Sequence, residues 1–450
     1  MTETQVEAST GLSGPSGIDA GLKPTLVILF VVSLVAAAGN MALQSVMPAI
    51  GRAFALSDTL VAGAFSISAL LWALSSPLWA RLSDRIGRKP VLMIGLTGFT
   101  VSMFATGLAT HSGLALWCAP VVAFSLMVAG RSAHGLFGSG APSASQAYLA
   151  DRTTDTERTS AISVLASAQG VGTVIGPAVA PFFILPLIGL AGPMFAFATL
   201  GAVVLWLVWR RLPNDAVEKR ARPRPVKRAV AGGLWWDRRT RDFVLYGFLL
   251  LTVQASNMSV LGFHVIDEMG RTGVAPAQAQ AFIGVAMLAG AAATLMMQWG
   301  LIPLLGLRPQ ALLRYGAGIT IVGNLISVMA PSYIGVVLGY AVSSMGLGLA
   351  RPGFIAGSSL AVSDEEQGDI AGMMVSLAGL SFLGAPMVGV ALYGVWTPAP
   401  FVANLAILAV ATMLALRSAA LRDSEQPATA AILAAQVAQP GPGGFPDNQG

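Results

Sequence analysis

Two basic side chains, Arg131 and His134, stand three residues apart in the long and mostly apolar stretch 120–150. That spacing puts both on one face of a helix. If the stretch crosses a membrane, Arg131 lies near its middle, where a charge is costly and by default functional. His134 could itself gain and lose a proton near neutral pH. A neutral histidine hydrogen-bonded between helices is the alternative, so the pair is a candidate for proton chemistry.

A second concentration of charge lies at 80–92, ARLSDRIGRKPVL, in a chain with only 10% charged residues. Its charged side chains are Arg81, Asp84, Arg85, Arg88 and Lys89. Asp84 can accept a hydrogen bond from Arg88 one helical turn on, and can also lie against the positive N-terminus of a neighbouring helix. A tight, water-exposed loop between two membrane helices accounts for this density, because its cations would mark the cytoplasmic face. The alternative is a basic cytoplasmic loop with no further role.

The elements that hold these residues are predicted to be membrane helices. The chain is 55% apolar with a mean hydropathy of +0.71, whereas soluble proteins average about 45–50% apolar. Stretches of about 18 or more apolar residues are long enough to span a bilayer. About twelve such stretches are present, at 24–47, 59–80, 90–110, 120–150, 160–185, 190–209, 243–265, 278–299, 311–330, 333–357, 370–394 and 399–417. We therefore expect an all-α integral membrane protein.

Composition also argues against several classes of function. The cations flank apolar segments and do not form a patch with stacking aromatics, which speaks against nucleic-acid binding despite the net charge of +5. Three histidines and the single Cys118 supply no intrachain disulfide and no convergent catalytic or metal-ligand set. The sequence has no phosphate-binding loop for ATP. We expect no enzyme, no metal and no cofactor, with an intramembrane enzyme or a sensor as remote alternatives.

The distribution of cations predicts the topology. An even number of spans puts both termini on one side, and the positive-inside rule makes that side the cytoplasm. Of the 26 Lys and Arg residues, only Arg52 and Arg271 then lie outside, and only Arg131 and Arg351 fall within spans. We expect a multi-pass protein of the cell inner (cytoplasmic) membrane with both termini cytoplasmic.

The chain also divides into two similar halves. Gly138 and Pro142 recur as Gly348 and Pro352, in the same orientation. Such a duplication is what two six-helix halves related by an axis along the membrane normal require, with substrate bound between them. The expected domains are a disordered cytoplasmic tail, 1–23, a first bundle, 24–209, a basic cytoplasmic linker, 210–242, a second bundle, 243–418, and a disordered cytoplasmic tail, 419–450.

The charged segment at 80–92 resembles the signature loop of the major facilitator superfamily, G-x-L-A-D-R-x-G-R-K. The matching residues are Leu82, Asp84, Arg85, Gly87, Arg88 and Lys89, whereas Ala80 and Ser83 replace a Gly and an Ala. ADRTTDTER at 150–158 is similar to the family's A-D-x-x-x-x-x-E-R. The resemblance implies the major facilitator fold and a gating role in which the loop's cations pair with Asp151 and Glu157. Such contacts would hold only while the cytoplasmic side is shut.

Three further segments resemble the family's twelve-span drug/proton antiporters. RSAHG at 131–135 is similar to R-x-x-Q-G, with His134 in place of Gln, and the Arg of that motif is associated with proton transfer. AQGVGTVIGPAVAP at 168–181 resembles the antiporter motif G-x-x-x-G-P-x-x-G-G through Gly172, Gly176 and Pro177, and so implies exchange. A small-residue packing face, common in membrane bundles, is the alternative for these residues. Gln367 and Gly368 match a Q-G step that opens the eleventh helix of tetracycline/proton antiporters.

The substrate cavity is expected between spans 1, 4, 7 and 10. Its polar residues would be Asn40, Gln44, Ser143, Gln146, Gln254 and Asn257. They offer hydrogen bonds without charge, which suits a neutral or amphipathic ligand. A role in packing between helices is the alternative for each amide.

No acid lies deep in any predicted span, although drug/proton antiporters often carry one. Asp58, Asp267 and Glu268 lie near outer helix ends, the last two close to His264. Proton coupling would then use His134, those carboxylates, or nothing. We expect a monomeric secondary transporter that exports a small amphipathic drug-like molecule or metabolite by alternating access, driven by the proton gradient. A facilitator or a proton symporter for a small metabolite is the alternative.

Overall fold

The computed structural model describes residues 22–153, 155–214, 233–305, 307–363 and 366–422. The tails and the basic linker of the sequence analysis fall largely outside these ranges, at 1–21, 215–232 and 423–450. Nearly all of the described chain is helical, apart from turns and one isolated bridge between Leu185 and Gly189. Twelve of the described helices are long and apolar enough to cross a membrane, which confirms the predicted all-α membrane fold.

The first half consists of six spanning elements, two of which change helix type along their length. The fourth span passes from α4 into a π-helix and then α5, and the fifth ends in a 3₁₀ turn. The elements are α1 (Lys23–Ala53), α2 (Asp58–Ile86), α3 (Arg88–Leu114), α4 (Pro120–Ala133), η1 (His134–Gly138), α5 (Gly140–Ala150), α6 (Asp155–Val179), η2 (Ala180–Phe183) and α7 (Gly192–Arg211).

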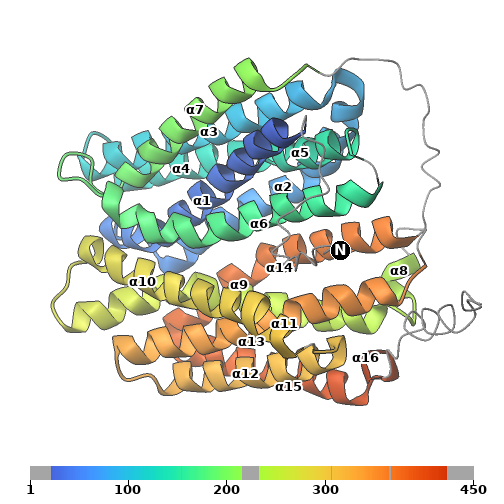
Figure 1. Cartoon of the computed structure of the whole chain (residues 1–450). Coiled ribbons are helices and arrows are strands. Elements are labelled where there is room, and N and C mark those ends of the chain that lie inside the picture. The colour runs from blue at the N-terminus through green and yellow to red at the C-terminus, as the bar shows by residue number, and fades with distance from the viewer. Residues whose placement is uncertain (1–21, 154, 215–232, 306, 364–365, 423–450) are drawn as a thin grey trace, which may run out of the picture.

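The second half repeats this layout, with its π-helix in another span. The elements are α8 (Gly233–Trp236), α9 (Arg241–Arg271), α10 (Pro276–Leu295), η3 (Met296–Leu301), α11 (Ile302–Leu305), α12 (Pro309–Met329), α13 (Tyr333–Leu360), α14 (Gln367–Val395), α15 (Ala399–Arg417) and α16 (Ala419–Arg422). The first half lies above the second in Figure 1, from blue to green and from yellow to red.

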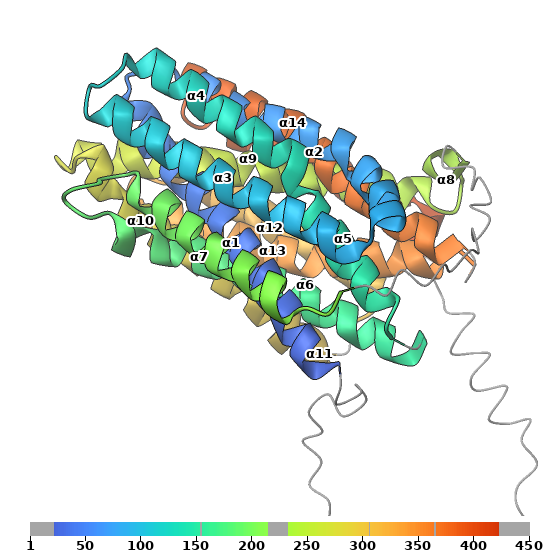
Figure 2. The same cartoon turned by 90° about the horizontal axis from the view of Figure 1, so that it is seen from above.

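The two halves meet along a few helices. α2 packs against α14, and α1 and α6 pack against α10. Figure 2 shows α14 alongside α2, seen from above. We call the end of the bundle where α7 ends and α9 begins the linker end. The opposite end, where α1 and α9 both finish, is the far end.

The charged segment at 80–92 differs from the expected loop. α2 continues to Ile86, α3 begins at Arg88, and only Gly87 separates them. Gly87 has φ 100° and ψ 161°, a conformation that is essentially restricted to glycine. The prediction of a loop was wrong because the apolar run stops near residue 80, whereas a helix needs no apolar face once it has left the membrane. The charged side chains therefore project from two helix ends that meet at a one-residue corner.

Candidate functional site

Arg131 and His134 lie in the interior of the first half, as their spacing predicted. Arg131 is the third-last residue of α4 and is only 4% exposed, and His134 opens the π-helix η1 and is 5% exposed. The Arg131 guanidinium carbon lies 5.0 Å from the centre of the Phe65 ring of α2, a cation–π distance. The His134 ring lies between Trp72 and Phe99, at centroid distances of 5.4 and 5.8 Å.

Both side chains keep unused hydrogen-bonding capacity. Among the described residues, neither Nε nor Nη1 of Arg131 has a hydrogen-bond partner, and neither has Nδ1 of His134. Leaving a buried charge uncompensated costs several kcal/mol in general, so a fold keeps one only where it serves another purpose. The pair is therefore buried and keeps unused hydrogen-bonding atoms, as a candidate site for proton chemistry requires.

The π-helix that carries His134 is stabilised by α2. A π turn inserts one extra residue and disturbs the regular pattern of backbone hydrogen bonds. Ser68 Oγ donates to the Arg131 carbonyl and Ser75 Oγ to the Gly135 carbonyl, both at 3.0 Å. Trp79 Nε1 donates to the Leu136 carbonyl. Inside a membrane no water can satisfy these carbonyls, so the polar face of α2 is what allows the irregular turn. This role of the α2 serines is not predictable from their spacing in the sequence.

The predicted cavity residues do not share one environment. Asn40, Gln44 and Gln254 are half-buried, Ser143 donates to the Ser139 carbonyl at 3.0 Å, and Gln146 is exposed. Gln44 lines a small cavity between the halves. Of the predicted cavity residues, Gln44 therefore lines a cavity between the halves. Asn40, Ser143, Gln146 and Gln254 lie on the expected spans but do not line that cavity.

Asn257 belongs to the interior of the second half. Its Nδ2 donates to Ser343 Oγ at 2.9 Å, and its Oδ1 accepts from Asn404 at 2.8 Å. Asn324 joins the same network through Ser343 and Asn404. Three amides from α9, α12 and α15 thus satisfy one another in the packed core, and Asn257 corresponds to the packing alternative and not to a cavity wall.

The halves are closely packed toward the far end. The cavity between them has a volume of about 20 Å³ and is lined by Gln44, Phe65, Met258, Met287 and residues near them. A cavity of this size holds about one water molecule. Gln280 Nε2 of α10 donates to Ser45 Oγ of α1 across the interface at 3.1 Å, and Pro48 packs against Gly262. A drug-sized ligand does not pass this point in the described state.

A cluster of ionised side chains closes the far end. Arg52 at the end of α1 binds Asp58 of α2 in a bidentate pair, at 2.9 and 2.8 Å, and binds Asp267 of α9 at 3.0 Å. Tyr393 of α14 donates to Asp267 at 2.8 Å. Asp58 and Asp267 are predicted from the sequence to lie near outer helix ends, but the contact of Arg52 with both of them across the two halves is not.

The signature residues gather at the linker end of the first half. Arg88 binds Asp84 one turn earlier, and its Nε lies 2.9 Å from Asp151 Oδ2 at the end of α5. These described contacts all join helices of the first half. Arg85 is exposed, and the side chain of Glu157 lies outside the described residues. The structure thus brings together Asp84, Arg88 and Asp151 while the far end is closed.

Lys89 has a different role from the other cations of the segment. It is 8% exposed and donates to the carbonyls of Trp209 and Leu212 at 3.0 and 2.6 Å, and to Asn214 Oδ1 at 3.0 Å. These acceptors belong to the end of α7 and the residues after it. A cation that binds the last carbonyls of a helix satisfies groups that have no partner within that helix. Lys89 therefore fixes the start of α3 to the end of the sixth span.

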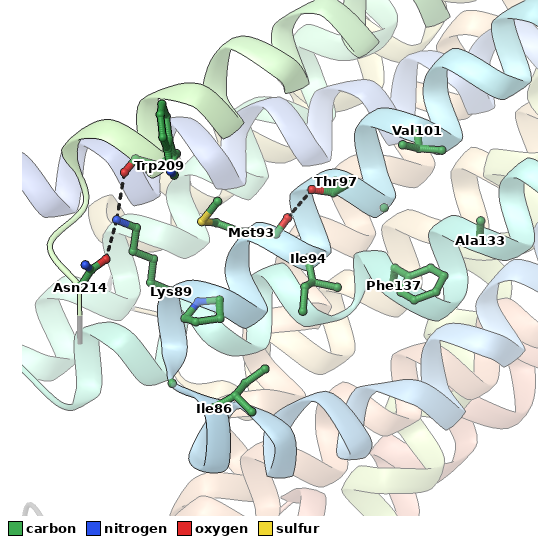
Figure 3. A pocket seen from close by; sticks show the side chains of 13 residues that line it. Ile86, Lys89, Met93, Ile94, Thr97, Val101, Ala133, Phe137, Trp209 and Asn214 are labelled. Atoms are coloured by element: carbon green, nitrogen blue, oxygen red, sulfur yellow. Dashed lines mark hydrogen bonds between the residues drawn. The ribbon is translucent and has the colours of Figure 1, made fainter. Parts of the chain in front are cut away.

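A larger cavity of about 930 Å³ lies beside Lys89 along the outer side of α3 (Figure 3). Its walls are mainly apolar and come from α3, the end of α2, the π-helix and the end of α7. The lining includes Met93, Ile94, Val101, Phe137 and Trp209. Several of these side chains are largely exposed at the surface of the bundle, so the hollow opens sideways and is distinct from the space between the halves.

The second half has its own ionic contact at the linker end. Arg239 binds Asp237 at 2.7 Å and Glu366 at 3.1 Å, which ties the turn before α9 to the turn before α14. The hydrogen bonds from Arg239 lower the pKa of the Asp237 and Glu366 carboxyls below their usual values. The two carboxylates in turn raise the pKa of Arg239. Glu366 occupies the position that corresponds to Glu157 in the other half.

The antiporter-like glycines lie where α6 crosses α1. A Cβ on Gly172 would come within 2.6 Å of the Leu34 carbonyl oxygen, and one on Gly176 would come closer still to the Ala38 carbonyl oxygen. Pro177, the next residue, lies inside α6 and its carbonyl approaches Gly284 of the second half. The motif therefore makes a backbone-to-backbone contact that only glycine permits.

Comparisons with known proteins agree with this architecture. The chain is 26% identical to the class C tetracycline resistance protein of Escherichia coli over 390 residues, 82% of this chain and 89% of that protein. It is 25% identical to multidrug resistance protein 2 of Bacillus subtilis (strain 168) over 388 residues, 84% of this chain and 91% of the relative.

Solved structures share the fold at lower identity. A bacterial homologue of the human lysosomal transporter Spinster, inward-facing and occupied, aligns with a TM-score of 0.70 and 13% identity over 91% of this chain and 99% of that one. A D-xylose-proton symporter aligns with a TM-score of 0.68 and 14% identity over 90% and 99%. A model of the Major Facilitator Superfamily matches residues 29–382, and this chain belongs to that family of membrane transporters.

Proposed function

We propose that this chain is a monomeric secondary transporter that works by alternating access and exports a small amphipathic molecule in exchange for protons. The observation that carries the proposal is the similarity to a tetracycline resistance protein and a multidrug resistance protein, each over more than four-fifths of the chain. Drug-like or metabolite substrates of mixed polarity are the class that this similarity favours.

We propose that the linker end lies on the cytoplasmic side of a cell inner membrane. The described cations at that end include Arg81, Arg85, Arg152, Arg210 and Arg211, and such an excess is typical of the cytoplasmic side. Arg210 lies over Trp206 and Trp209, at 5.8 and 5.6 Å from their ring centres. Tryptophans near the end of a spanning helix are typical of the membrane–water interface. On this orientation, the described state is closed toward the outside.

In alternating access, contacts at the two ends form in different states. The signature contact between Arg88 and Asp151 lies within the first half and is present while the far end is closed. We therefore propose that this contact positions the end of α5 against the α2–α3 corner. The surface formed there would then contact the second half when the linker end closes. Asp84, Arg85, Gly87 and Glu157 would contribute to the same surface, and Lys89 would hold the start of α3 in place behind it.

For proton coupling we propose the buried pair Arg131 and His134. His134 Nδ1 has no hydrogen-bond partner among the described residues, so protonation there breaks no existing bond. Arg131, three residues earlier on the same span, places a positive charge and a titratable ring together in one buried site. Asn40, Gln44 and Gln254 are proposed to bind the substrate through uncharged hydrogen bonds.

The test is transport in everted membrane vesicles, in which outward transport appears as accumulation. A panel of amphipathic compounds is assayed with an acidic lumen and with no gradient. Wild type should accumulate substrate only with the gradient. His134→Gln should lose gradient-driven accumulation but keep substrate counterflow, which needs alternating access without net proton movement.

His111→Gln is the matched control, because His111 lies in the last turn of α3 with its ring against Trp117, away from the proposed site. It should transport as wild type does. Gradient-driven accumulation that survives in His134→Gln would remove His134 from the coupling mechanism. No response of the wild type to any pH gradient would contradict proton-coupled export and favour a facilitator.

A further inference from the structure

One charged cluster links the two halves directly. Arg52 ends α1, Asp58 opens α2, and both belong to the first half, whereas Asp267 lies on α9 in the second. The Arg52 guanidinium contacts both carboxylates, through Nε and Nη2 to Asp58 and through Nη2 to Asp267. One cation is thus shared by two anions, and only the Asp267 contact crosses the interface.

The two contacts respond differently when the halves separate. Arg52 and Asp58 are six residues apart on adjacent helix ends, so their bidentate pair moves with the first half. Asp267 moves with the second half and retains its bond from Tyr393, which belongs to the same half. Opening the far end therefore leaves Arg52 neutralised and deprives Asp267 of its only described ion pair.

We infer that Asp267 is a proton-binding residue whose protonation releases the far-end contact between the two halves. A neutral Asp267 carboxyl has no Coulomb attraction to Arg52, so protonation weakens the contact between the halves. Conversely, once the halves separate, Arg52 no longer competes with a proton for the Asp267 carboxylate. Protonation and opening thus favour each other, as any two events linked through one equilibrium must.

The surroundings of Asp267 fit this role. Its side chain is 34% exposed, so a proton reaches it from the far-end solution without crossing the packed core. Glu268 beside it already binds Arg271. His264, one turn earlier on α9, has its ring near Tyr393 and Phe401 at 5.7 and 5.6 Å.

The other elements packed against α9 supply no charged group at the far end. α10 and η3 (276–301) carry no Asp, Glu, Lys, Arg or His, and the only charged residues of α13 and α15, Arg351 and Arg417, lie toward the linker end. The charged and titratable groups that face Asp267 are therefore Arg52 and Asp58 from the first half, and His264, Glu268, Arg271 and Tyr393 from the second. Arg52 is thus one cation for two carboxylates, so the net charge of the Arg52, Asp58 and Asp267 triad is negative.

For transport, this inference rests on the proposed function. In a proton-driven exporter, a proton taken up at the far end would open that end for substrate release. Its arrival at Asp267 would then precede transfer to any deeper site such as His134. The far-end proton site is thus a coupling residue separate from the Arg131 and His134 pair.

The experiment measures the far end without any gradient. Spin labels at Leu187→Cys and Ala275→Cys report the distance between exposed far-end positions of the two halves, in a Cys118→Ser background that removes the single native cysteine. Wild type should shift toward longer distances as pH falls. For one proton, the ratio of open to closed protein changes by at most about tenfold per pH unit.

Asp267→Asn should show a larger open fraction that no longer depends on pH. Asp267→Glu should restore the pH dependence, which a merely structural role would not predict. Gln280→Leu removes an uncharged contact between the halves, so it should raise the open fraction but keep the wild-type slope. Asp58→Asn should also keep the slope, because Asp58 stays with Arg52 in both states.

A wild-type slope in Asp267→Asn, or loss of the slope in Asp58→Asn alone, would overturn the inference. Both outcomes would leave proton-driven transport untouched as measured in vesicles. Conversely, transport that ignores the pH gradient would refute the proposed function, while the pH-dependent distances would stand.

Discussion

The contact between α6 and α1 gives the sharpest quantitative test, because α6 carries two glycines in opposite surroundings. A Cβ on Gly172 would lie 2.6 Å from the Leu34 carbonyl oxygen and 2.8 Å from Ala37 Cβ, whereas a Cβ on Gly170 would meet nothing within 4 Å. Both substitutions to alanine gain the same helix propensity, about 0.5–1 kcal/mol. The difference between them therefore isolates the cost of forcing the two helices apart.

The magnitude follows from the overlap. A Cβ closer than about 3 Å to a backbone oxygen must be relieved by moving a backbone, and inserting one methyl group into a packed interior costs about 1–3 kcal/mol. Gly170→Ala should be neutral or stabilising by up to about 1 kcal/mol. Gly172→Ala should thus be less stable than Gly170→Ala by about 1–3 kcal/mol.

The assay is unfolding by a denaturing detergent, followed by far-UV circular dichroism, with the two variants and wild type measured side by side. Similar slopes of the transitions would confirm that the unfolded states are comparable. If Gly172→Ala were as stable as Gly170→Ala, the α1–α6 contact would not be the tight backbone approach described, and the antiporter-like glycines would need another explanation.

Three further predictions follow from other contacts. Asn257→Ala leaves Asn404 without its closest acceptor, so it should destabilise the protein by about 1–3 kcal/mol in the same unfolding assay, and a changed substrate profile without lost stability would contradict the packing role. Lys89→Met leaves buried carbonyls at the end of α7 without their donor, so amide exchange there should speed up. Unchanged exchange would contradict the role of Lys89 in fixing α3 to the end of α7. Arg239 holds the pKa of Glu366 below its usual value, so their contact is present above the unfolded-state pKa and is lost as pH falls through the folded-state pKa. Amide-exchange protection at 233–242, corrected for the intrinsic pH dependence of exchange, should therefore fall in acid for wild type and be low at all pH values in Arg239→Gln. An acid-dependent loss of protection that persists in the variant would show that another group causes it.

The sequence was a good guide to the spans and a weaker one to their ends. Apolar runs predicted all twelve spanning helices because the bilayer sets their minimum length. The same runs underestimated α2, which extends to Ile86, because helical structure beyond the membrane leaves no hydropathy signal. The π-helix at His134 was also unpredicted, since its stability depends on serines of α2 far away in the sequence.

The candidate site was predictable where it depended on one helix. Arg131 and His134 follow from a charge within an apolar run and a spacing of three residues. The Arg52–Asp267 contact joins residues more than 200 positions apart, and Asn257 faces its own half although α9 also borders the other. Such features depend on how the two bundles dock and on how each helix is rotated, which neither hydropathy nor motif spacing specifies.

The one-residue corner at Gly87 has a mechanical consequence. With no spacer between them, α2 and α3 are joined as the two arms of an elbow, and α2 rests on α14 of the other half. The second arm is bound through Lys89 to Asn214, the last described residue before the polypeptide crosses to the second half. A tilt of α2 imposed by α14 is therefore transmitted through Gly87 to α3 and, through the Lys89 hydrogen bonds, to the end of α7.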